Sequence, residues 1–217
     1  MITREELLRT AKLVGLKPFQ EEKHYIQTII LRSIYSRISD ELIFKGGTAL
    51  WFFQGLNRFS GDLDFSIIRN LNIDVLTKKI VGDLELMGVR TTLRVERDNF
   101  RIGAEGPLFT REIERCFVRV EVSKRGDVVM KAIPQEYDPI YLDILPFSVM
   151  IMNPREGLAE KVRAIMTRDR ARDIYDLWFL LKKKVDFDVQ LVDKKLAYYK
   201  KEFSLEEFIE RIKGRRD

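Results

Sequence analysis

The sequence predicts an α+β fold, in which a mixed sheet flanked by helices is followed by a C-terminal helical bundle. Strand-like alternation of apolar and polar residues recurs in short segments, none of which extends beyond residue 152. Helical spacing of apolar residues lies between those segments and is the only pattern beyond Pro154. We therefore expect an α/β core with N-terminal helices over residues 1–152, and a helical region over residues 153–217 that completes the cleft.

The N-terminal segment predicts two helices. Thr3 and Glu6 have the spacing of a capping box, so a helix should cover residues 4–14 and end at Gly15. A longer helix is expected over residues 19–39, because apolar residues recur there at helical spacing. Those residues are Tyr25, Ile29, Ile30, Ile34 and Ile38.

The middle of the chain predicts alternating strands and helices. A brief extended segment at 42–45 should lead through the glycine turn Gly46-Gly47 into a helix that ends near residue 55. A strand over 62–68 and a helix over 72–86 follow. The further strands expected are 89–95, 99–104, 117–123, 141–145 and 149–152.

The C-terminal part predicts helices only, over 154–168, 170–182, 188–200 and 204–213. Pro154 suits the first turn of the first helix, and Ser204 with Glu207 has capping-box spacing at the last one. Tyr175, Leu177, Trp178 and Leu181 are expected to pack in the core. The tail, residues 213–217, is expected to be frayed and solvated. The chain contains no internal repeat or low-complexity segment.

Composition excludes several classes of site. The 217 residues carry 39 basic and 34 acidic side chains, a net charge of +5 that permits a polyanionic partner. The only cysteine, Cys116, excludes a disulfide framework within one chain, and we expect it to be a small core residue. The only histidine, His24, excludes a Ser-His-Asp triad or a multi-histidine metal site within one chain. We expect His24 to be a surface or partly packed residue.

The sequence gives no sign of a membrane location. Its first residues are polar and charged, unlike a signal peptide, and no apolar run approaches 18 residues. We therefore expect a cytoplasmic protein.

A pair of acidic residues, Asp62 and Asp64, is the first candidate for chemistry. Residues i and i+2 of a strand point to the same face, about 6.5–7 Å apart. Two carboxylates at that range repel each other unless a cation lies between them. Mg²⁺ prefers carboxylate oxygens together with substrate phosphates. The pair alone is also typical of loops and of protein surfaces.

The glycine turn Gly46-Gly47-Thr48 is the second candidate, because it opens a predicted helix upstream of the acidic pair. Paired glycines let backbone N–H groups approach a phosphate, and a helix N-terminus adds free donors. The Thr48 hydroxyl could donate to a phosphate or cap the helix. The spacing is not that of a Walker A loop, and a plain tight turn is the alternative interpretation.

A third carboxylate is expected for two-metal chemistry, and Glu121 is our candidate. In the alternating strand 117–123, Arg119, Glu121 and Ser123 share one face. Asp143 is the rival, and a solvent-facing glutamate is the alternative interpretation of Glu121.

Four motifs in order resemble those of AbiEii/AbiGii-type nucleotidyltransferases, which belong to the polymerase-β-like superfamily. They span residues 44–50, 58–65, 160–164 and 171–177. Many members of this family are toxins of abortive-infection toxin–antitoxin pairs. The resemblance covers about residues 20–185 and implies a polymerase-β-like nucleotidyltransferase core.

The resemblance also implies an activity. A nucleoside monophosphate would move from a nucleoside triphosphate to an acceptor hydroxyl, with Mg²⁺ or Mn²⁺ as cofactor and pyrophosphate as the leaving group. The acceptor would be RNA, such as a tRNA 3′ end, or a protein. A cognate antitoxin would be a separate chain.

Residue roles follow from the resemblance position by position. Glycines 46 and 47, Thr48 and Ser60 would hold the triphosphate. Asp62, Asp64 and Glu121 would bind metal, although the family often has aspartate at the third position. Lys161 matches the motif lysine that contacts nucleotide phosphates, and Asp173 matches the final motif aspartate near the site.

Two other functions stay open on the sequence alone. The same fold could bind a nucleotide or a partner without turnover, or a metal-dependent nuclease could use the clustered carboxylates. The sequence does not identify the nucleotide, the acceptor or the oligomeric state.

Overall fold

The computed structural model of the chain describes residues 1–214, which form two compact units. Unit 1 contains residues 1–124 and 134–151, and unit 2 contains residues 125–133 and the chain from Met152 onward. Each unit has apolar side chains buried in its own interior, such as Ile30 in unit 1 and Val162 in unit 2.

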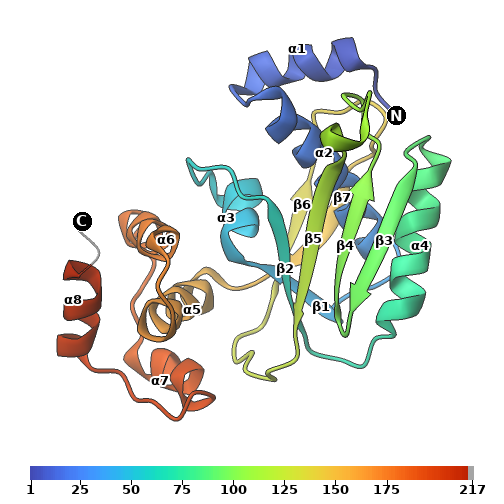
Figure 1. The fold of residues 1–217 in the computed structure, drawn as a ribbon. Coiled ribbons are helices and arrows are strands. Elements are labelled where there is room, and N and C mark those ends of the chain that lie inside the picture. The colour runs from blue at the N-terminus through green and yellow to red at the C-terminus, as the bar shows by residue number, and fades with distance from the viewer. Residues whose placement is uncertain (215–217) are drawn as a thin grey trace. The chain divides into compact units, whose positions relative to one another are not determined.

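Unit 1 is built on a mixed sheet. Among the described residues the sheet has seven strands in the order β3-β4-β5-β2-β1-β7-β6 (Figure 1). β2 pairs in parallel with β5, and β1 with β7, whereas the other pairs with a defined register are antiparallel. The strands are β1 Leu42–Lys45, β2 Asp62–Ile67, β3 Thr91–Glu96, β4 Asn99–Ala104, β5 Cys116–Ser123, β6 Ile133–Tyr137 and β7 Phe147–Ile151.

The sheet has a buried face and an outer face. Val118, Val120 and Val122 of β5 are buried, whereas the residues between them are exposed. This alternation is the one expected of a strand that packs on only one side. The helix α2 lies on the buried side, where the Tyr35 and Phe65 rings are 6.5 Å apart.

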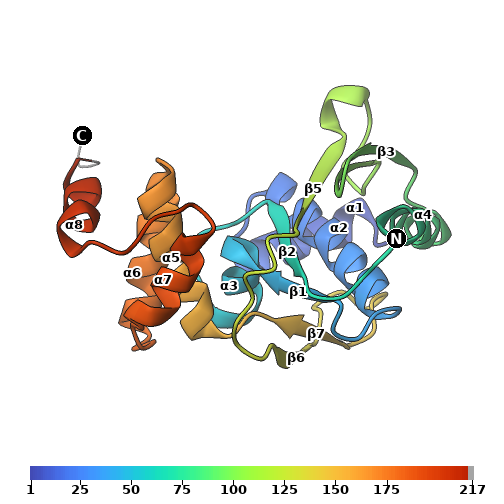
Figure 2. The same cartoon turned by 90° about the horizontal axis from the view of Figure 1, so that it is seen from below.

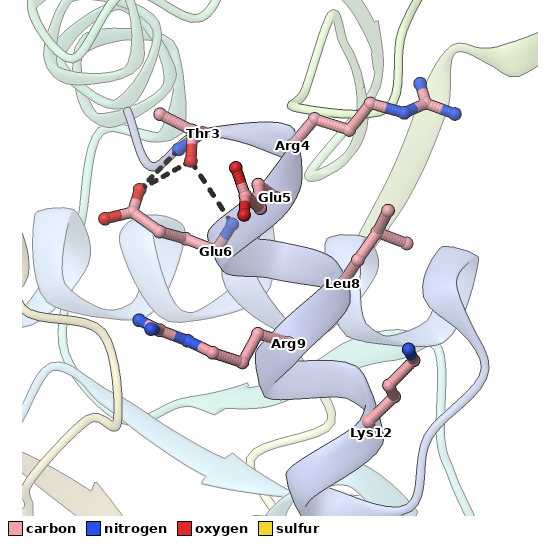
Figure 3. Close-up of a pocket in the computed structure, with 7 residues that line it drawn as sticks. All are labelled: Thr3, Arg4, Glu5, Glu6, Leu8, Arg9 and Lys12. Carbon is pink, nitrogen blue, oxygen red and sulfur yellow. Dashed lines mark hydrogen bonds between the residues drawn. The ribbon is translucent and has the colours of Figure 1, made fainter.

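The helices of unit 1 are α1 Arg4–Val14, α2 Pro18–Tyr35, α3 Gly46–Gln54 and α4 Ile73–Leu86. The capping box of α1 is present: the Thr3 side chain accepts from the Glu6 N–H, and Glu6 accepts from the Thr3 N–H at 2.8 Å (Figure 3). Ser33 of α2 donates to Asp83 of α4 at 2.6 Å, and this hydrogen bond joins the two helices.

Unit 2 is helical, with α5 Pro154–Thr167, α6 Ala171–Lys182, α7 Val189–Ala197 and α8 Leu205–Lys213. α5 packs against α6 and α7 within this unit (Figure 2). The buried Glu156 of α5 accepts hydrogen bonds from the backbone of Val129 and Met130, at 2.8 and 2.9 Å. These bonds attach residues 125–133 to the helices.

The structure confirms most of the predicted elements and corrects several. Residues 141–145 are not a strand but a turn, in which the Ile144 N–H bonds to the Tyr141 carbonyl. The strand β6 was not predicted, because its polar sequence lacks the alternation of a half-buried strand. The helix α2 ends at Tyr35, four residues earlier than predicted. Residues 215–217 of the predicted frayed tail lie outside the described residues.

Two predictions about packing were wrong. His24 is buried, and its two ring nitrogens are hydrogen-bonded with the hydroxyls of Tyr137 and Tyr141 at 2.9 and 2.8 Å. Trp178 and Leu181 are about half exposed rather than in the core, since they lie on the solvent side of α6.

Cys116 is buried as expected, and burial raises the pKa of its thiol to about 12. Within residues 1–214, no helix is long and apolar enough to cross a membrane.

Candidate nucleotide-binding site

The glycine turn brings the start of α3 against the acidic strand β2. Gly46 has a φ of +78°, a conformation that side-chain-bearing residues rarely adopt. A Cβ atom at Gly46 would lie 2.5 Å from Oδ2 of Asp64. Glycine therefore lets the first helical turn approach the Asp64 carboxylate.

Gly47 makes a second close approach. A Cβ atom there would meet the Arg58 guanidinium and would lie 3.1 Å from the Ser60 hydroxyl oxygen. The backbone at the start of α3 thus has a cation and a hydroxyl beside it. Such a group of donors and positive charge suits an anionic ligand.

The Thr48 hydroxyl, expected either to donate to a phosphate or to cap the helix, has another partner in the structure. The side chain is buried, and the hydroxyl donates a short hydrogen bond to the carbonyl oxygen of Asp62. In this structure Thr48 positions the backbone of Asp62 relative to α3.

The acidic pair lies on the outer face of the sheet. In the strand register, Asp64 lies opposite Lys45 of β1 on one side and opposite Glu121 of β5 on the other. Directly paired residues on neighbouring strands project from the same face. Asp62, Asp64 and Glu121 therefore share one face.

The three carboxylates match Mg²⁺ in donor type, because this cation takes oxygen ligands. Within the part of the chain that the structure describes, no group of three acidic, histidine or cysteine side chains has the geometry of a preformed metal site. The side chain of Glu121 is 47% exposed and forms an ion pair with Arg119 at 3.4 Å. The residues present thus fit a divalent cation in type and face, and rotation of the exposed Glu121 side chain would have to bring it to the acidic pair.

Asp143, the rival third carboxylate, is engaged elsewhere in unit 1. It accepts a hydrogen bond from the Tyr25 hydroxyl at 2.6 Å and lies 3.8 Å from the N-terminal amine of Met1. It has no strand register with Asp64, unlike Glu121.

Lys161 and Asp173 lie together inside unit 2. The Lys161 ammonium is 3.2 Å from Asp173 and 2.6 Å from Asp176, so it joins α5 to α6. Arg168 donates two hydrogen bonds to Asp173, at 2.8 and 2.9 Å. Burial favours a higher pKa for Asp173, but the bonds from Arg168 and the charge of Lys161 outweigh it and hold the pKa below its ordinary value.

The sequence from residue 29 to residue 216 matches the family model described as nucleotidyl transferase AbiEii toxin of type IV toxin–antitoxin systems. The chain belongs to the AbiEii family. This confirms the resemblance carried by the four motifs, and it makes the protein a nucleotidyltransferase of a toxin family. A search of curated proteins found no significant match to the chain.

Solved structures share the fold of this AbiEii protein. One is MenT4, a nucleotidyltransferase toxin from Mycobacterium tuberculosis H37Rv, with a TM-score of 0.70 and 18% identity over 95% of this chain and 77% of that one. Another is JHP933 from Helicobacter pylori, with a TM-score of 0.58 and 19% identity over 83% and 73% of the chains. A third is an antigenic nucleotidyltransferase-like protein from Paracoccidioides brasiliensis, with a TM-score of 0.54 and 16% identity over 82% and 87%. These likenesses confirm the predicted α+β nucleotidyltransferase fold.

Membership of the AbiEii family has general consequences. A nucleotidyltransferase uses a nucleoside triphosphate and, in general, a divalent metal. The type IV toxin–antitoxin description implies an antitoxin as partner.

Two basic residues near the site were not predicted as site residues. Arg58 lies against Gly47, and the Lys23 ammonium would be 3.2 Å from a Cβ atom at Gly61, next to Asp62. Arg58 stands in the second motif, so its nearness to the acidic pair in sequence was a usable signal. Lys23 comes from α2, and only the fold brings it to the loop.

The pocket in Figure 3 is a separate feature of unit 1. Thr3 and the first turns of α1 line it, and it contains none of the predicted site residues. The candidate site is therefore defined by the outer face of the sheet rather than by this pocket.

Proposed function

We propose that this AbiEii protein transfers a nucleoside monophosphate from a nucleoside triphosphate to an acceptor hydroxyl, with Asp62, Asp64 and Glu121 holding Mg²⁺ or Mn²⁺. The observation that carries the proposal is the strand register. It aligns Glu121 with Asp64, two residues from Asp62, on the face reached by the glycine turn.

The triphosphate would bind at the start of α3. The backbone N–H groups of Gly46 and Gly47 would donate to its oxygens, and Arg58 and Ser60 lie beside Gly47 to add charge and a hydroxyl. Thr48 would act by holding the backbone of Asp62.

In the reaction, the acceptor oxygen would attack the α-phosphorus and lose its proton to solvent water. The bond from that phosphorus to the bridging oxygen would break, and pyrophosphate would leave. Divalent cations supply charge neutralisation and lower the pKa of an attacking hydroxyl. The chain would contribute mostly by positioning both substrates.

Lys161 and Asp173 belong to the proposal as the motif lysine and aspartate, Lys161 contacting nucleotide phosphates and Asp173 lying near the site. In unit 2 the Lys161 ammonium is held by Asp173 and Asp176, so a phosphate would have to replace one of these carboxylates as its partner. Their bonds within unit 2 also give them a structural role, since they join α5 and α6.

The proposed acceptor is RNA, such as a tRNA 3′ end, and the cognate antitoxin would be a separate chain. The family description as a toxin of a type IV system supports the antitoxin. The net charge of +5 is compatible with a polyanionic acceptor.

The test is incubation with each α-labelled nucleoside triphosphate, Mg²⁺ and total cellular RNA, followed by gel analysis of label on RNA and on protein. We expect label on RNA that disappears with a chelator and with Glu121→Gln, whereas Asp143→Asn keeps activity. Activity in Glu121→Gln equal to that of wild type would exclude Glu121 as a metal ligand.

The gel and a calorimetric measurement together separate the transferase from a nuclease and from a non-catalytic binding module. A nuclease would shorten RNA without added nucleoside triphosphate. Binding of nucleoside triphosphate in calorimetry, without pyrophosphate release for any acceptor, would indicate a non-catalytic binding module.

A further inference from the structure

Three arginines form a row across the outer face of the sheet in unit 1. In the strand register, Arg94 of β3 lies opposite Arg101 of β4, and Arg101 lies opposite Arg119 of β5. Arg119 in turn lies opposite Asp62 of β2. Because neighbouring strands are about 4.8 Å apart, the row extends roughly 15 Å from the acidic pair. It crosses β5, β4 and β3, which are neighbours in the sheet (Figure 1).

The arginine row, as we name Arg94, Arg101 and Arg119, is open to solvent. The side chains of Arg94 and Arg119 are 78% and 57% exposed. Their neighbours along β4 and β5, such as Ile102 and Val118, are buried on the other face. The row therefore lies on the same face as the carboxylates.

An aromatic side chain lies beside the row. Phe117 precedes Arg119 by two residues on β5, so it projects from the same face, and it is 37% exposed. The Arg101 guanidinium carbon lies 4.0 Å from the centre of its ring. The ring lies over Gly103, where a Cβ atom would be only 2.8 Å from Cε1 of Phe117. Glycine at this position thus lets the ring lie against β4.

Two acidic residues on this face do not cancel the row. Glu96 pairs with Arg94 at 2.8 Å and Glu121 with Arg119 at 3.4 Å. Exposed ion pairs contribute little net free energy, so a phosphate can replace either carboxylate as the partner of its arginine. Arg101 stacks on Phe117 and lies between the other two arginines.

We infer that the arginine row and Phe117 bind the acceptor as a single strand of RNA, with phosphates on the arginines and a base stacked at the Phe117–Arg101 pair. A regular row of cations with an exposed aromatic ring is the combination that single-stranded nucleic acids require. An acidic protein segment could use the cations but has no base to stack on the ring. The inference rests on the proposed function in identifying the RNA as acceptor, and the row would lead its end toward Asp62.

The test measures binding of a fluorescent single-stranded RNA of mixed sequence to the full chain, without nucleoside triphosphate or metal. Arg94→Gln with Arg101→Gln should weaken binding at least about tenfold and reduce the salt dependence of log K by about 1.4, the amount for two lost phosphate contacts. Phe117→Ser should weaken binding about fivefold or more through lost stacking.

The control variant is Lys78→Gln with Lys79→Gln. It removes the same charge from exposed positions of α4, a helix packed against α2. It should change RNA affinity by less than about threefold, because these two lysines lie outside the arginine row, which the control keeps intact. Thermal unfolding of each variant checks that these surface changes leave the fold intact.

Equal affinities in the row variant and the control, or no binding of wild-type protein to RNA at low salt, would overturn the inference. Transfer of label to protein with no competition from RNA would overturn it while leaving the proposed transfer reaction standing. Conversely, the protein could bind RNA through the arginine row and yet never release pyrophosphate. That result would contradict the proposed reaction and support the RNA-binding surface.

Discussion

The charged side chains proposed to bind ligands in unit 1 are more exposed than the ion pairs that join the helices of unit 2. Unit 1 keeps its acidic pair and its arginine row on the outer face of a sheet, and buries a histidine that hydrogen-bonds to two tyrosines. Unit 2 buries whole ion pairs: Lys195 and Glu156 are 2.5 Å apart, and both are fully buried.

The difference shows which charges are available to a ligand. Exposed charges can change partners at low cost, because water and ligands compete for them. A buried pair has already lost its hydration, so removal of one partner leaves an uncompensated charge. Substitutions on the outer face of unit 1 should therefore affect activity more than stability, whereas loss of a buried ion pair in unit 2 should first of all lower stability.

The largest effect is expected for Asp62→Asn. It keeps the size of the side chain but removes a charge from the proposed metal site, so nucleotide transfer should fall on the order of 10³-fold. The free energy of unfolding should change by less than about 1 kcal/mol, since Asp62 is only partly buried. Transfer rates and urea unfolding of the same preparation measure both.

Asp138→Asn serves as the matched control for this prediction, because Asp138 is an exposed acid of unit 1 outside the site. It should keep wild-type transfer. If Asp62→Asn transfers nucleotide as fast as this control, Asp62 has no role in catalysis.

The second effect concerns the buried pairs of unit 2. Lys161→Met should lower the free energy of unfolding by about 3 kcal/mol, because Asp173 and Asp176 both lose the ammonium between them. Lys194→Met, at an exposed position of α7, should change it by less than about 0.5 kcal/mol. Urea unfolding compares the two variants.

Lys161→Arg tests how much of this stability depends on the positive charge alone. It retains the positive charge, so it should recover part of the lost stability. Full stability of Lys161→Met would show that the ion pairs between α5 and α6 contribute nothing.

Local patterns were enough to predict one half of the candidate site. The i, i+2 spacing placed Asp62 and Asp64 on one face, and the paired glycines predicted the tight entry to α3. Alternation in β5 also placed Glu121 on a polar face. Each of these features depends on residues adjacent in the chain.

The other half depends on distant segments and could not be predicted. The register of β2 with β5 aligns Glu121 with Asp64, residues 57 positions apart by their numbers, and no local pattern fixes such a register. His24 was expected near the surface because its partners, Tyr137 and Tyr141, lie 113 and 117 residues away. The predicted strand at 141–145 failed for a related reason, since contacts of Tyr141 and Asp143 with α2 hold that segment as a turn.

The smallest effect comes from His24, which is buried in unit 1 and hydrogen-bonded with Tyr137 and Tyr141. Burial lowers the pKa of His24 to about 3, far below the value of about 6.5 in an unfolded chain. As the pH falls below about 6.5, the unfolded state gains a proton that the native state does not, so stability decreases until the pH approaches 3. The protein should be about 1 kcal/mol less stable at about pH 5.5 than at about pH 7 from this residue alone.

His24→Gln isolates this contribution, because His24 is the only histidine of the chain. Glu21 acts with the opposite sign: burial raises its pKa, so the native state binds its proton first and gains stability as the pH falls. Glu21 is present in both proteins, so the difference between wild type and variant reports on the histidine. If the glutamine variant is less stable than wild type at pH 7, the urea midpoints of the two proteins should converge as the pH falls from 7 to 5.5. A constant difference between the midpoints would show that His24 is protonated in the native state as readily as in the unfolded one.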